Sequence, residues 1–451
     1  MTKDLAEMPV VNYGGDAWSS GEFPNVLARM AVEHGPIFRR LIPDGPHTGQ
    51  AFVFMVGPEA NRFVLHTHRD HFSHHLGWTP IIGEDFGHGL LNMDDPEHAS
   101  HRKMWNPAFT SACMEAYLPV INRAIGARTQ TWMARHEVDL YLEAREITFD
   151  AAAAALAGFR PGPAVDRLRE LFYVIIHGFD PAHENWEHFI TRSGNARSEL
   201  AATLLELIAE RRAAPPSESR DVLGMIVHAR DEHGQVLSDA QVLAHLNILL
   251  IAGHETTTTL GAWVLRLLAS EPEHRRRIEY VLRTLLGDTQ ELTVQALRGM
   301  RLLDNFIKEA GRLYAPVLNV PRGVVKPFEF GGYRVPAGTQ VRLALAAGHR
   351  LPHIFTDPMR FDPDRFAPPR EEDKRHQYAL VTFGGGPRIC IGISFAQIEV
   401  KALVAHVLRA FQLEPAHGTM PTHAGYWTAV LPDGMPVRVS AHPAAQALSR
   451  H

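Results

Sequence analysis

One ten-residue stretch, Phe383 to Gly392, places a cysteine on a loop of small residues. Three consecutive glycines, Gly384 to Gly386, let the backbone adopt positive φ angles and approach a flat ligand closely. Cys390 follows on this loop, and the Ala-, Leu- and Val-rich stretch from Ser394 to Phe411 predicts a helix directly behind it. A cysteine at a helix N-terminus is favoured as the thiolate, a soft ligand that binds iron well. Two residues earlier, Arg388 can offer a fixed positive charge to a carboxylate.

The spacing within this stretch resembles the haem-binding signature of the cytochrome P-450 family, the haem-thiolate monooxygenases. The signature reads Phe-x-x-Gly-x-Arg-x-Cys-x-Gly. Its five fixed positions are all matched, by Phe383, Gly386, Arg388, Cys390 and Gly392. The competing interpretation is a buried structural cysteine that follows a glycine turn. The resemblance implies that Cys390 is the axial ligand of the iron of haem b.

A second pattern with chemical potential lies in the middle of a long predicted helix. Ser238 and Gln241 form a capping box, which starts a helix running to Ser270. Spacing of 3.6 residues places one carboxylate and one hydroxyl on the same face as apolar residues. The members of that face are Ile248, Ile251, Ala252, Glu255 and Thr256. Polar groups in apolar surroundings are costly unless they serve a function. The competing interpretation is an internal capping threonine beside a surface glutamate.

The same helix carries Ala-Gly-His-Glu-Thr-Thr from Ala252, which resembles the oxygen-binding motif of the family. The resemblance implies that Glu255 and Thr256 assist protonation during oxygen activation. It also implies that Ala252 and Gly253 leave room for O₂. Glu255 replaces the aspartate often found in soluble bacterial members, and His254 precedes it, so proton delivery could differ in this chain.

A histidine and an arginine four residues apart form a third pattern. His98 and Arg102 share one face of a helix that the acids from Asp94 onward predict. A lone pair of this kind is more often a surface pair. It resembles the His-x-x-x-Arg of a family helix that holds the haem propionates, and the resemblance adds Arg322 and Arg388 as further propionate ligands.

Glu309 and Arg312 form a Glu-x-x-Arg pair, which by itself indicates only an ion pair within one helix. The later stretch Phe361 to Phe366 resembles the meander of the family. Together they imply a network of Glu309, Arg312 and Arg365 that braces the cysteine loop.

Five histidines between His66 and His75 form a separate cluster. Imidazoles three and four residues apart could bind a metal, but no nearby Cys or carboxylate group completes the set. A solvated, partly helical segment is the preferred interpretation.

The composition limits the classes of function. The net charge of −5 gives no basic surface for nucleic acid. The two cysteines, Cys113 and Cys390, argue against a disulfide framework and for a reducing compartment, and Cys113 is expected in the core. The first fifteen residues lack an apolar run, and the longest run elsewhere is too short to cross a bilayer. We therefore expect a soluble, cytoplasmic protein without a membrane anchor.

The chain is expected to form a single domain over residues 1–451. Its class is expected to be mainly α with a small β-rich subdomain. The order of the motifs resembles that of the cytochrome P-450 family over roughly residues 35 to 440 and implies the fold of that family. The β-rich part is expected at about 36–60 and 317–345, with a Gly-Gly hairpin at 328–333, and residues 442–451 as a frayed tail. Predicted helices include 59–65, 124–136, 143–157, 163–177, 186–212 and 297–314.

The predicted activity is insertion of one atom of O₂ into a mid-sized, apolar organic molecule. The residues assigned to the substrate pocket are apolar: Ile248, Ile251, Ala252, Val317, Leu318 and Val430. The chain contains no flavin or iron–sulfur motif, so electrons are expected from a separate ferredoxin or flavodoxin with its NAD(P)H reductase. Two alternatives stay open: an H₂O₂-dependent peroxygenase, which would be expected to lack the alcohol of Thr256, and a non-catalytic haem-binding recruitment protein.

Overall fold

The computed structural model describes residues 2–11, 17, 20–41, 51–177, 186–215, 221–287 and 291–443. The chain is divided into two compact units. The first unit comprises residues 1–77, 129–144 and 256–451, and the second comprises 78–128 and 145–255. Four helices, α3, α5, α7 and α11, have residues in both units. The prediction of a single domain stays a prediction.

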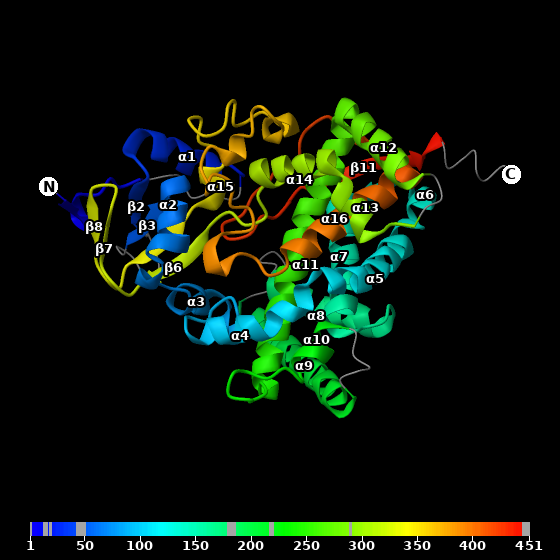
Figure 1. Cartoon of the computed structure of the whole chain (residues 1–451), viewed down its shortest axis with the longest axis horizontal. Helices are drawn as coiled ribbons and strands as arrows, with labels where there is room; N and C mark the ends of the chain where they lie inside the picture. The colour runs from blue at the N-terminus through cyan, green and yellow to red at the C-terminus, as the bar shows by residue number, and fades with distance from the viewer. Residues whose placement is uncertain are drawn as a thin grey trace. The chain divides into compact units, whose positions relative to one another are not determined.

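Helices form most of both units, which confirms the predicted mainly α class (Figure 1). The first unit contains α1 (Phe23–His34), α2 (Pro58–Arg62), α6 (Trp132–Arg135), α12 (Pro272–Leu286), α13 (Val294–Gly299), α14 (Arg301–Leu313), α15 (Leu345–Gly348) and α16 (Ile393–Ala410). The second unit contains α4 (Glu97–Trp105), α8 (Pro163–His177), α9 (Trp186–Ala213) and α10 (Val222–Ile226). The helices with residues in both are α3 (His75–Phe86), α5 (Ser111–Thr129), α7 (Leu140–Ala157) and α11 (Asp239–Ser270).

All the described strands belong to the first unit. A five-stranded sheet has the order β2 (Ile37–Leu41), β3 (Ala51–Met55), β9 (Gln340–Leu343), β6 (Val320–Val324) and β4 (Phe72–Ser73). Only the β3–β9 pairing is parallel. Strands that are almost three hundred residues apart in the sequence thus lie side by side. Two three-stranded sheets have the orders β1 (Lys3–Asp4), β8 (Tyr333–Val335), β7 (Phe328–Phe330), and β10 (Phe411–Pro415), β11 (Pro436–Ala441), β5 (Glu137–Asp139).

Alternation along the strands builds a separate core on each face of the five-stranded sheet. Successive strand residues point to opposite faces. Val53 and Met55 belong to one cluster of buried side chains, with Val341 and Leu343. Phe54, between them, belongs to another cluster that includes Phe23 of α1. The sheet is therefore buried on both sides.

The hairpin and several helix boundaries confirm the sequence predictions. Gly331 and Gly332 have φ angles of 57° and 83°, as a two-residue hairpin turn requires. Ser238 caps α11, since the Gln241 backbone N–H donates to its Oγ and the Ser238 N–H donates to the Gln241 side chain. Helix α11 then runs uninterrupted to Ser270.

Two predicted helices are wrong in extent. The helix expected at 124–136 is interrupted at residues 130–131, between α5 and α6, where the buried Trp132 indole donates a 2.7 Å hydrogen bond to Glu143. His136 then takes a φ of 59° ahead of strand β5. The helix expected at 297–314 is interrupted at Met300, between α13 and α14. Tertiary contacts override local helix propensity at the first of these breaks.

The histidine-rich segment follows α2 as a π-helical turn, η2 (Phe63–Thr67), and a 3₁₀ turn, η3 (Arg69–His71). His66 and His75 are exposed. Among the described residues, no three His, Cys, Asp or Glu side chains are grouped so as to hold a metal ion. No helix formed by the described residues is long and apolar enough to cross a membrane. Residues 42–50 of the predicted β-rich part and residues 444–451 of the predicted tail lie outside the described residues.

Candidate functional site

The cysteine loop of the first unit presents Cys390 at the protein surface. Gly384 and Gly386 have φ angles of 74° and 63°, a region that side-chain-bearing residues rarely adopt. A Cβ on Gly386 would lie 2.3 Å from the carbonyl oxygen of Leu65 in η2, so only glycine fits there. The Cys390 N–H donates to the Phe383 carbonyl at 2.9 Å, which closes the loop. Cys390 is an exposed thiol.

Helix α16 begins three residues after this cysteine, one residue earlier than predicted. Its N-terminus supplies positive potential close to the sulfur. At Gly392, by contrast, a Cβ would cause no steric clash within the protein, because it would lie at an ordinary contact distance of 3.9 Å from the Cys390 Sγ. The exposed thiol, the close-fitting glycine loop and the helix N-terminus are suited to a flat, iron-containing group.

Two arginines of the first unit were assigned to haem propionates. Arg322 lies on β6, is 4% exposed and donates through Nη1 to the Pro321 carbonyl at 2.6 Å. Arg388 lies on the 3₁₀ turn η8 (Gly386–Arg388) and is half-buried, as is Phe383. A guanidinium carries five N–H donors in a planar fork, so one side chain can bond to a backbone carbonyl and to a carboxylate at the same time.

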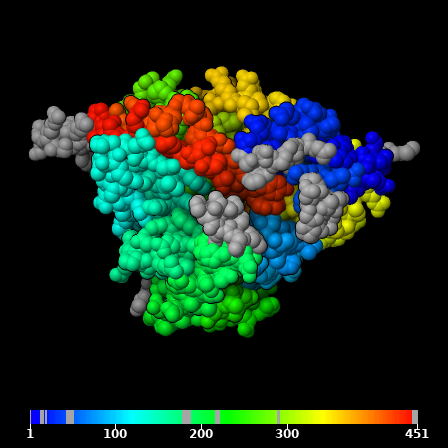
Figure 2. Space-filling view, turned by 180° about the vertical axis from the view of Figure 1, so that it is seen from behind, coloured from blue at the N-terminus to red at the C-terminus, as the bar shows by residue number. Residues whose placement is uncertain are grey.

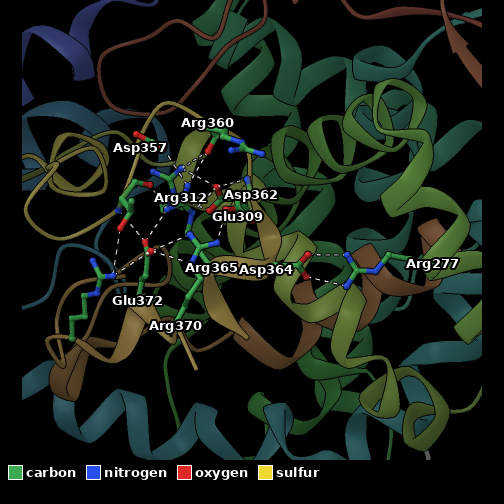
Figure 3. A network of polar contacts seen from close by, with 12 residues as sticks. Arg277, Glu309, Arg312, Asp357, Arg360, Asp362, Asp364, Arg365, Arg370 and Glu372 are labelled. Carbon is green, nitrogen blue, oxygen red and sulfur yellow. Dashed lines mark hydrogen bonds and ion pairs between the residues drawn. The ribbon is translucent and has the colours of Figure 1, made fainter. Parts of the chain in front are cut away.

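The residues predicted to form a network do meet in the first unit (Figure 3). Arg312 donates to both carboxylate oxygens of Glu309, at 2.7 and 2.9 Å, and Arg365 donates to Glu309 at 2.9 Å. Sequence reasoning missed Glu372, which accepts from Arg365 at 2.8 Å and from Arg370 at 3.0 Å. Glu309, Arg312, Arg365 and Glu372 are all fully buried.

Burial raises the pKa of the Glu372 carboxyl, but hydrogen bonds from Arg370, Arg365 and the Thr356 N–H outweigh it and leave the pKa at about 2. Glu372 is therefore ionised at neutral pH. Its position, seven residues after Arg365, has no spacing signal, because Pro368-Pro369 separates it from the preceding turn.

In the second unit, α4 carries His98 and Arg102. His98 is 4% exposed, with Nδ1 3.5 Å from Asp95 Oδ1, and Arg102 donates through Nε to Asn106 at 2.9 Å. Trp105, three residues after Arg102, is buried, and its Nε1–H has no hydrogen-bond partner among the described residues. A buried donor without a partner is costly. Its i+7 spacing from His98 puts it on the same helix face, and that spacing was the signal that sequence reasoning missed.

The α11 segment of the second unit is exposed at Ala252 and half-buried at Ile251 and Gly253, whereas Ile248 is buried. A Cβ on Gly253 would make only ordinary contact, 3.7 Å from Leu156. Thr256, the first residue of the adjoining first-unit segment, is half-buried. Within the long, mostly buried helix, this stretch leaves surface for a ligand.

The Glu255 carboxylate contacts two neighbours in the second unit. Its Oε1 lies 3.0 Å from His254 Nε2 and 3.4 Å from Arg145 Nε on α7. Arg145 in turn lies over the ring of Tyr173, 3.6 Å from its centroid. His254 is fully buried, and its Nδ1 lies 2.7 Å from the Leu250 carbonyl oxygen. The predicted acid is thus held beside a histidine and an arginine.

The other pocket residues lie in the first unit. Val317 forms a β-bridge with Thr428, and the Val430 N–H donates to the Ala424 carbonyl at 2.7 Å. Val317 and Val430 are half-buried. Leu318 is 2% exposed and packs in a small cluster with Ala315, Ala346 and Ala429.

The comparisons with known proteins agree on one family. The family profile described as Cytochrome P450 matches residues 7–433. Cytochrome P450 136 of Mycobacterium tuberculosis is 32% identical over 398 residues, covering 85% of this chain and 79% of the relative. Sterol 14alpha-demethylase of Mycolicibacterium vanbaalenii is 30% identical over 372 residues, which cover 81% of this chain and 82% of the relative. The retinoic-acid-bound cyanobacterial CYP120A1 has a TM-score of 0.83 and 26% identity, covering 98% of this chain and 100% of that one.

The mainly α fold with small sheets is shared with solved cytochrome P450 structures. This chain belongs to the cytochrome P450 family. It is an oxidoreductase, a haem-dependent monooxygenase whose cofactor is haem b.

Proposed function

We propose that Cys390 is the axial ligand of the haem iron, and the observation that carries this proposal is its exposed thiol on the glycine loop. The other cysteine of the chain, Cys113, is only half-buried and contacts the Pro107 carbonyl at 3.3 Å. It lies in the first turn of α5 and has no glycine loop before it. A thiolate ligand donates electron density to the iron, and the haem then supplies the activation of O₂.

We assign the haem propionates to His98, Arg102, Arg322 and Arg388. Arginine is suited to this role because its planar N–H groups pair with carboxylate oxygens. Support comes from the buried Nε1–H of Trp105, which has no partner in the described part of the chain and lies on the helix face that carries His98 and Arg102. We add Trp105 to the predicted set as a donor toward the haem. The network of Glu309, Arg312 and Arg365 is proposed to hold the meander that precedes the cysteine loop.

For proton delivery we propose that Glu255 and Thr256 act together, with His254 as the neighbour that shares a proton with Glu255. The Leu250 carbonyl can only accept, so His254 Nδ1 carries the hydrogen in their 2.7 Å contact. His254 Nε2 and Glu255 Oε1 are 3.0 Å apart, which requires one hydrogen between them. The two side chains therefore hold one proton one residue before Thr256. Ala252 and Gly253 carry no bulk that would obstruct O₂.

The proposed substrate is a mid-sized, mostly apolar molecule, taken by Ile248, Ile251, Ala252, Val317, Leu318 and Val430. Burying such apolar surface contributes about 25 cal/mol per Å². Retinoic acid, the ligand named for one solved structure, is of this kind. So is a sterol, the substrate class in the name of one relative by sequence. Electrons are proposed to come from a separate ferredoxin or flavodoxin with an NAD(P)H reductase. The proposed location is the cytoplasm, where cysteines that form no disulfide, such as Cys113 and Cys390, are expected.

The test of the ligand assignment is the carbon-monoxide difference spectrum of the reduced protein. The wild type is expected to show the red-shifted Soret band of thiolate ligation. Cys390→His should keep haem and lose that band, and the matched control Cys113→Ser should keep both. A wild type without the band, or a Cys390→His variant that retains it, would contradict the assignment.

A further inference from the structure

Two histidines of the second unit, His101 on α4 and His245 on α11, form a buried contact to which the proposed function gives no role. The Nδ1 of His101 lies 2.7 Å from the Nε2 of His245, and the ring centroids are 5.0 Å apart. His245 is 1% exposed and His101 is 8% exposed. The other nitrogen of the His245 ring, Nδ1, accepts a hydrogen bond of 3.3 Å from the Leu90 backbone N–H. The histidine pair therefore links α4, α11 and the segment that carries Leu90.

That segment, loop 87–92, lies between α3 and α4, is braced internally and packs closely on α11. Asn92 accepts from the Gly89 N–H at 2.8 Å and donates to the Gly87 carbonyl at 3.0 Å. A Cβ on Gly89 would lie 2.9 Å from the Cδ1 of Ile248, so glycine is needed for this close approach. The loop therefore covers part of Ile248, which is 4% exposed and which we assign to the substrate pocket.

The helix that precedes the loop is anchored separately. Arg197 of α9 pairs with Asp85 near the end of α3, and its Nη2 lies 3.3 Å from Glu84 Oε1. In Figure 2 the light-blue part of the chain that includes α3 lies against the green part that includes α9. The start of loop 87–92 is thus held by α9, whereas its contact with α11 depends on the histidine pair.

The hydrogen bonds fix where the hydrogens of the pair lie. The Nδ1 of His245 can accept from Leu90 only if it carries no hydrogen, so a neutral His245 carries its hydrogen on Nε2. That N–H donates to the Nδ1 of His101, and His101 carries its own hydrogen on Nε2. The two contacts together need two ring nitrogens without hydrogen. A pair with one added proton has only one such nitrogen, so one of the two contacts must break.

The contact that breaks is the one with Leu90. If the Nδ1 of His245 stayed without hydrogen, two N–H groups would face each other across 2.7 Å. If His101 instead takes the proton and donates to His245, the hydrogen of His245 moves to Nδ1 and faces the Leu90 N–H. The longer contact, of 3.3 Å, is the weaker of the two. The added charge then rests on His101, the more exposed ring.

The surroundings of the pair keep it neutral at neutral pH. Burial lowers the pKa of both imidazoles, and the pKa of His245 falls to about 3. Titratable groups near the pair come from loop 87–92, from α4 and from the segment before α11: His88, Glu97, His98 and Asp231. The two carboxylates raise the pKa of His101, whereas His88 lowers the pKa of both rings. The contact with Leu90 is therefore present at neutral pH and is lost as the pH falls below 6.5, the ordinary histidine value.

We propose that His101 and His245 are positioning residues that hold loop 87–92 against α11, fix one wall of the substrate pocket beside Ile248, and release the loop when the pair takes up one proton. This inference rests on the proposed function, which assigns Ile248 to the pocket. The simpler interpretation is that the two rings only fill space between α4 and α11.

Hydrogen–deuterium exchange of the haem-loaded protein, expressed as the protection factor of the peptide that contains loop 87–92, separates the two interpretations. At about pH 8, His245→Phe keeps a ring but cannot accept from Leu90. Protection should fall about fivefold, the effect of one hydrogen bond. His101→Asn keeps an acceptor for the His245 N–H and should behave as the wild type. The control His233→Asn, whose side chain is 78% exposed, should also leave protection unchanged.

Lowering the pH to about 5 gives a readout that a space-filling role would not move. Protection of the wild-type loop should fall toward that of His245→Phe, while a peptide from α16 keeps its protection. His101→Asn should retain protection of the loop, because a proton could then enter only on His245, with its pKa of about 3. Unchanged protection in His245→Phe at pH 8, or an equal response of the wild type and His101→Asn to acid, would overturn the proposal.

The consequence for the pocket is tested with 1-dodecylimidazole and imidazole, whose binding is read from the Soret band. The two probes share the iron-binding ring and differ in an apolar chain. His245→Phe should bind 1-dodecylimidazole several-fold more weakly at pH 8 and imidazole as the wild type does. Equal affinities of the variant and the wild type for both probes would contradict the role in the pocket. A wild type whose Soret band responds to neither probe would contradict the proposed function instead, and the exchange data would still decide whether the pair holds the loop.

Discussion

Replacing Glu309 by glutamine should be among the most destabilising single changes in the first unit. The carboxylate accepts four hydrogen bonds: two from Arg312, one from Arg365 and one from the Asp362 N–H at 2.9 Å. Glutamine keeps the volume but removes the charge, and its NH₂ group would face guanidinium donors. Two buried arginines would then lack their shared counter-charge. Breaking a buried ion pair by removing one partner costs about 3–5 kcal/mol.

The matched control lies in the same part of the chain. Asp364 pairs with Arg277 through two hydrogen bonds, of 2.8 and 3.0 Å, but their side chains are 45% and 38% exposed (Figure 3). An exposed pair contributes about 0–1 kcal/mol. Asp364→Asn should therefore lower the free energy of unfolding by at most about 1 kcal/mol.

The assay is urea unfolding of the haem-loaded protein, followed by far-ultraviolet circular dichroism and by the Soret band. We expect the Glu309→Gln midpoint to fall well below that of Asp364→Asn, with haem released at a lower urea concentration. Losses of equal size in the two variants would show that burial of this network does not set its energetic importance. The reasoning from the four contacts would then be refuted.

Two further predictions follow from single side chains. Thr256→Ala should lower the ratio of product formed to NAD(P)H consumed several-fold, while NAD(P)H consumption persists and more H₂O₂ is released. The control Thr257→Ala alters a buried neighbour and should leave that ratio unchanged. An unchanged ratio in Thr256→Ala would show that the hydroxyl has no part in proton delivery. Glu372 has a folded-state pKa of about 2, below its usual 4.5, so its contribution to stability is present above pH 4.5 and is lost as the pH falls toward 2. The difference in unfolding free energy between wild type and Glu372→Gln should therefore be constant above pH 4.5 and shrink below it; a difference independent of pH would contradict the assigned ionisation.

Local rules in the sequence determined the elements that carry the chemistry. A capping box fixed the start of α11, a glycine pair fixed the β7–β8 turn, and the spacing from Phe383 to Gly392 identified the cysteine loop. In each case the signal lies within about ten residues, because capping, turn formation and loop closure depend on neighbours along the chain. The family followed from the order of these motifs.

Only the tertiary structure decided which distant side chains meet. Glu372 completes the buried network, and the Arg342 guanidinium lies over the ring of Trp427, more than eighty residues away in the sequence; no spacing rule predicts either contact. The break after Thr129 has the same origin, since the Trp132 indole bonds to Glu143. The sequence places His254 next to Glu255, but only the structure shows its Nδ1 2.7 Å from the Leu250 carbonyl oxygen and its Nε2 3.0 Å from Glu255 Oε1. Hydrogen-bond partners of buried polar groups are chosen by packing, which period and propensity do not encode.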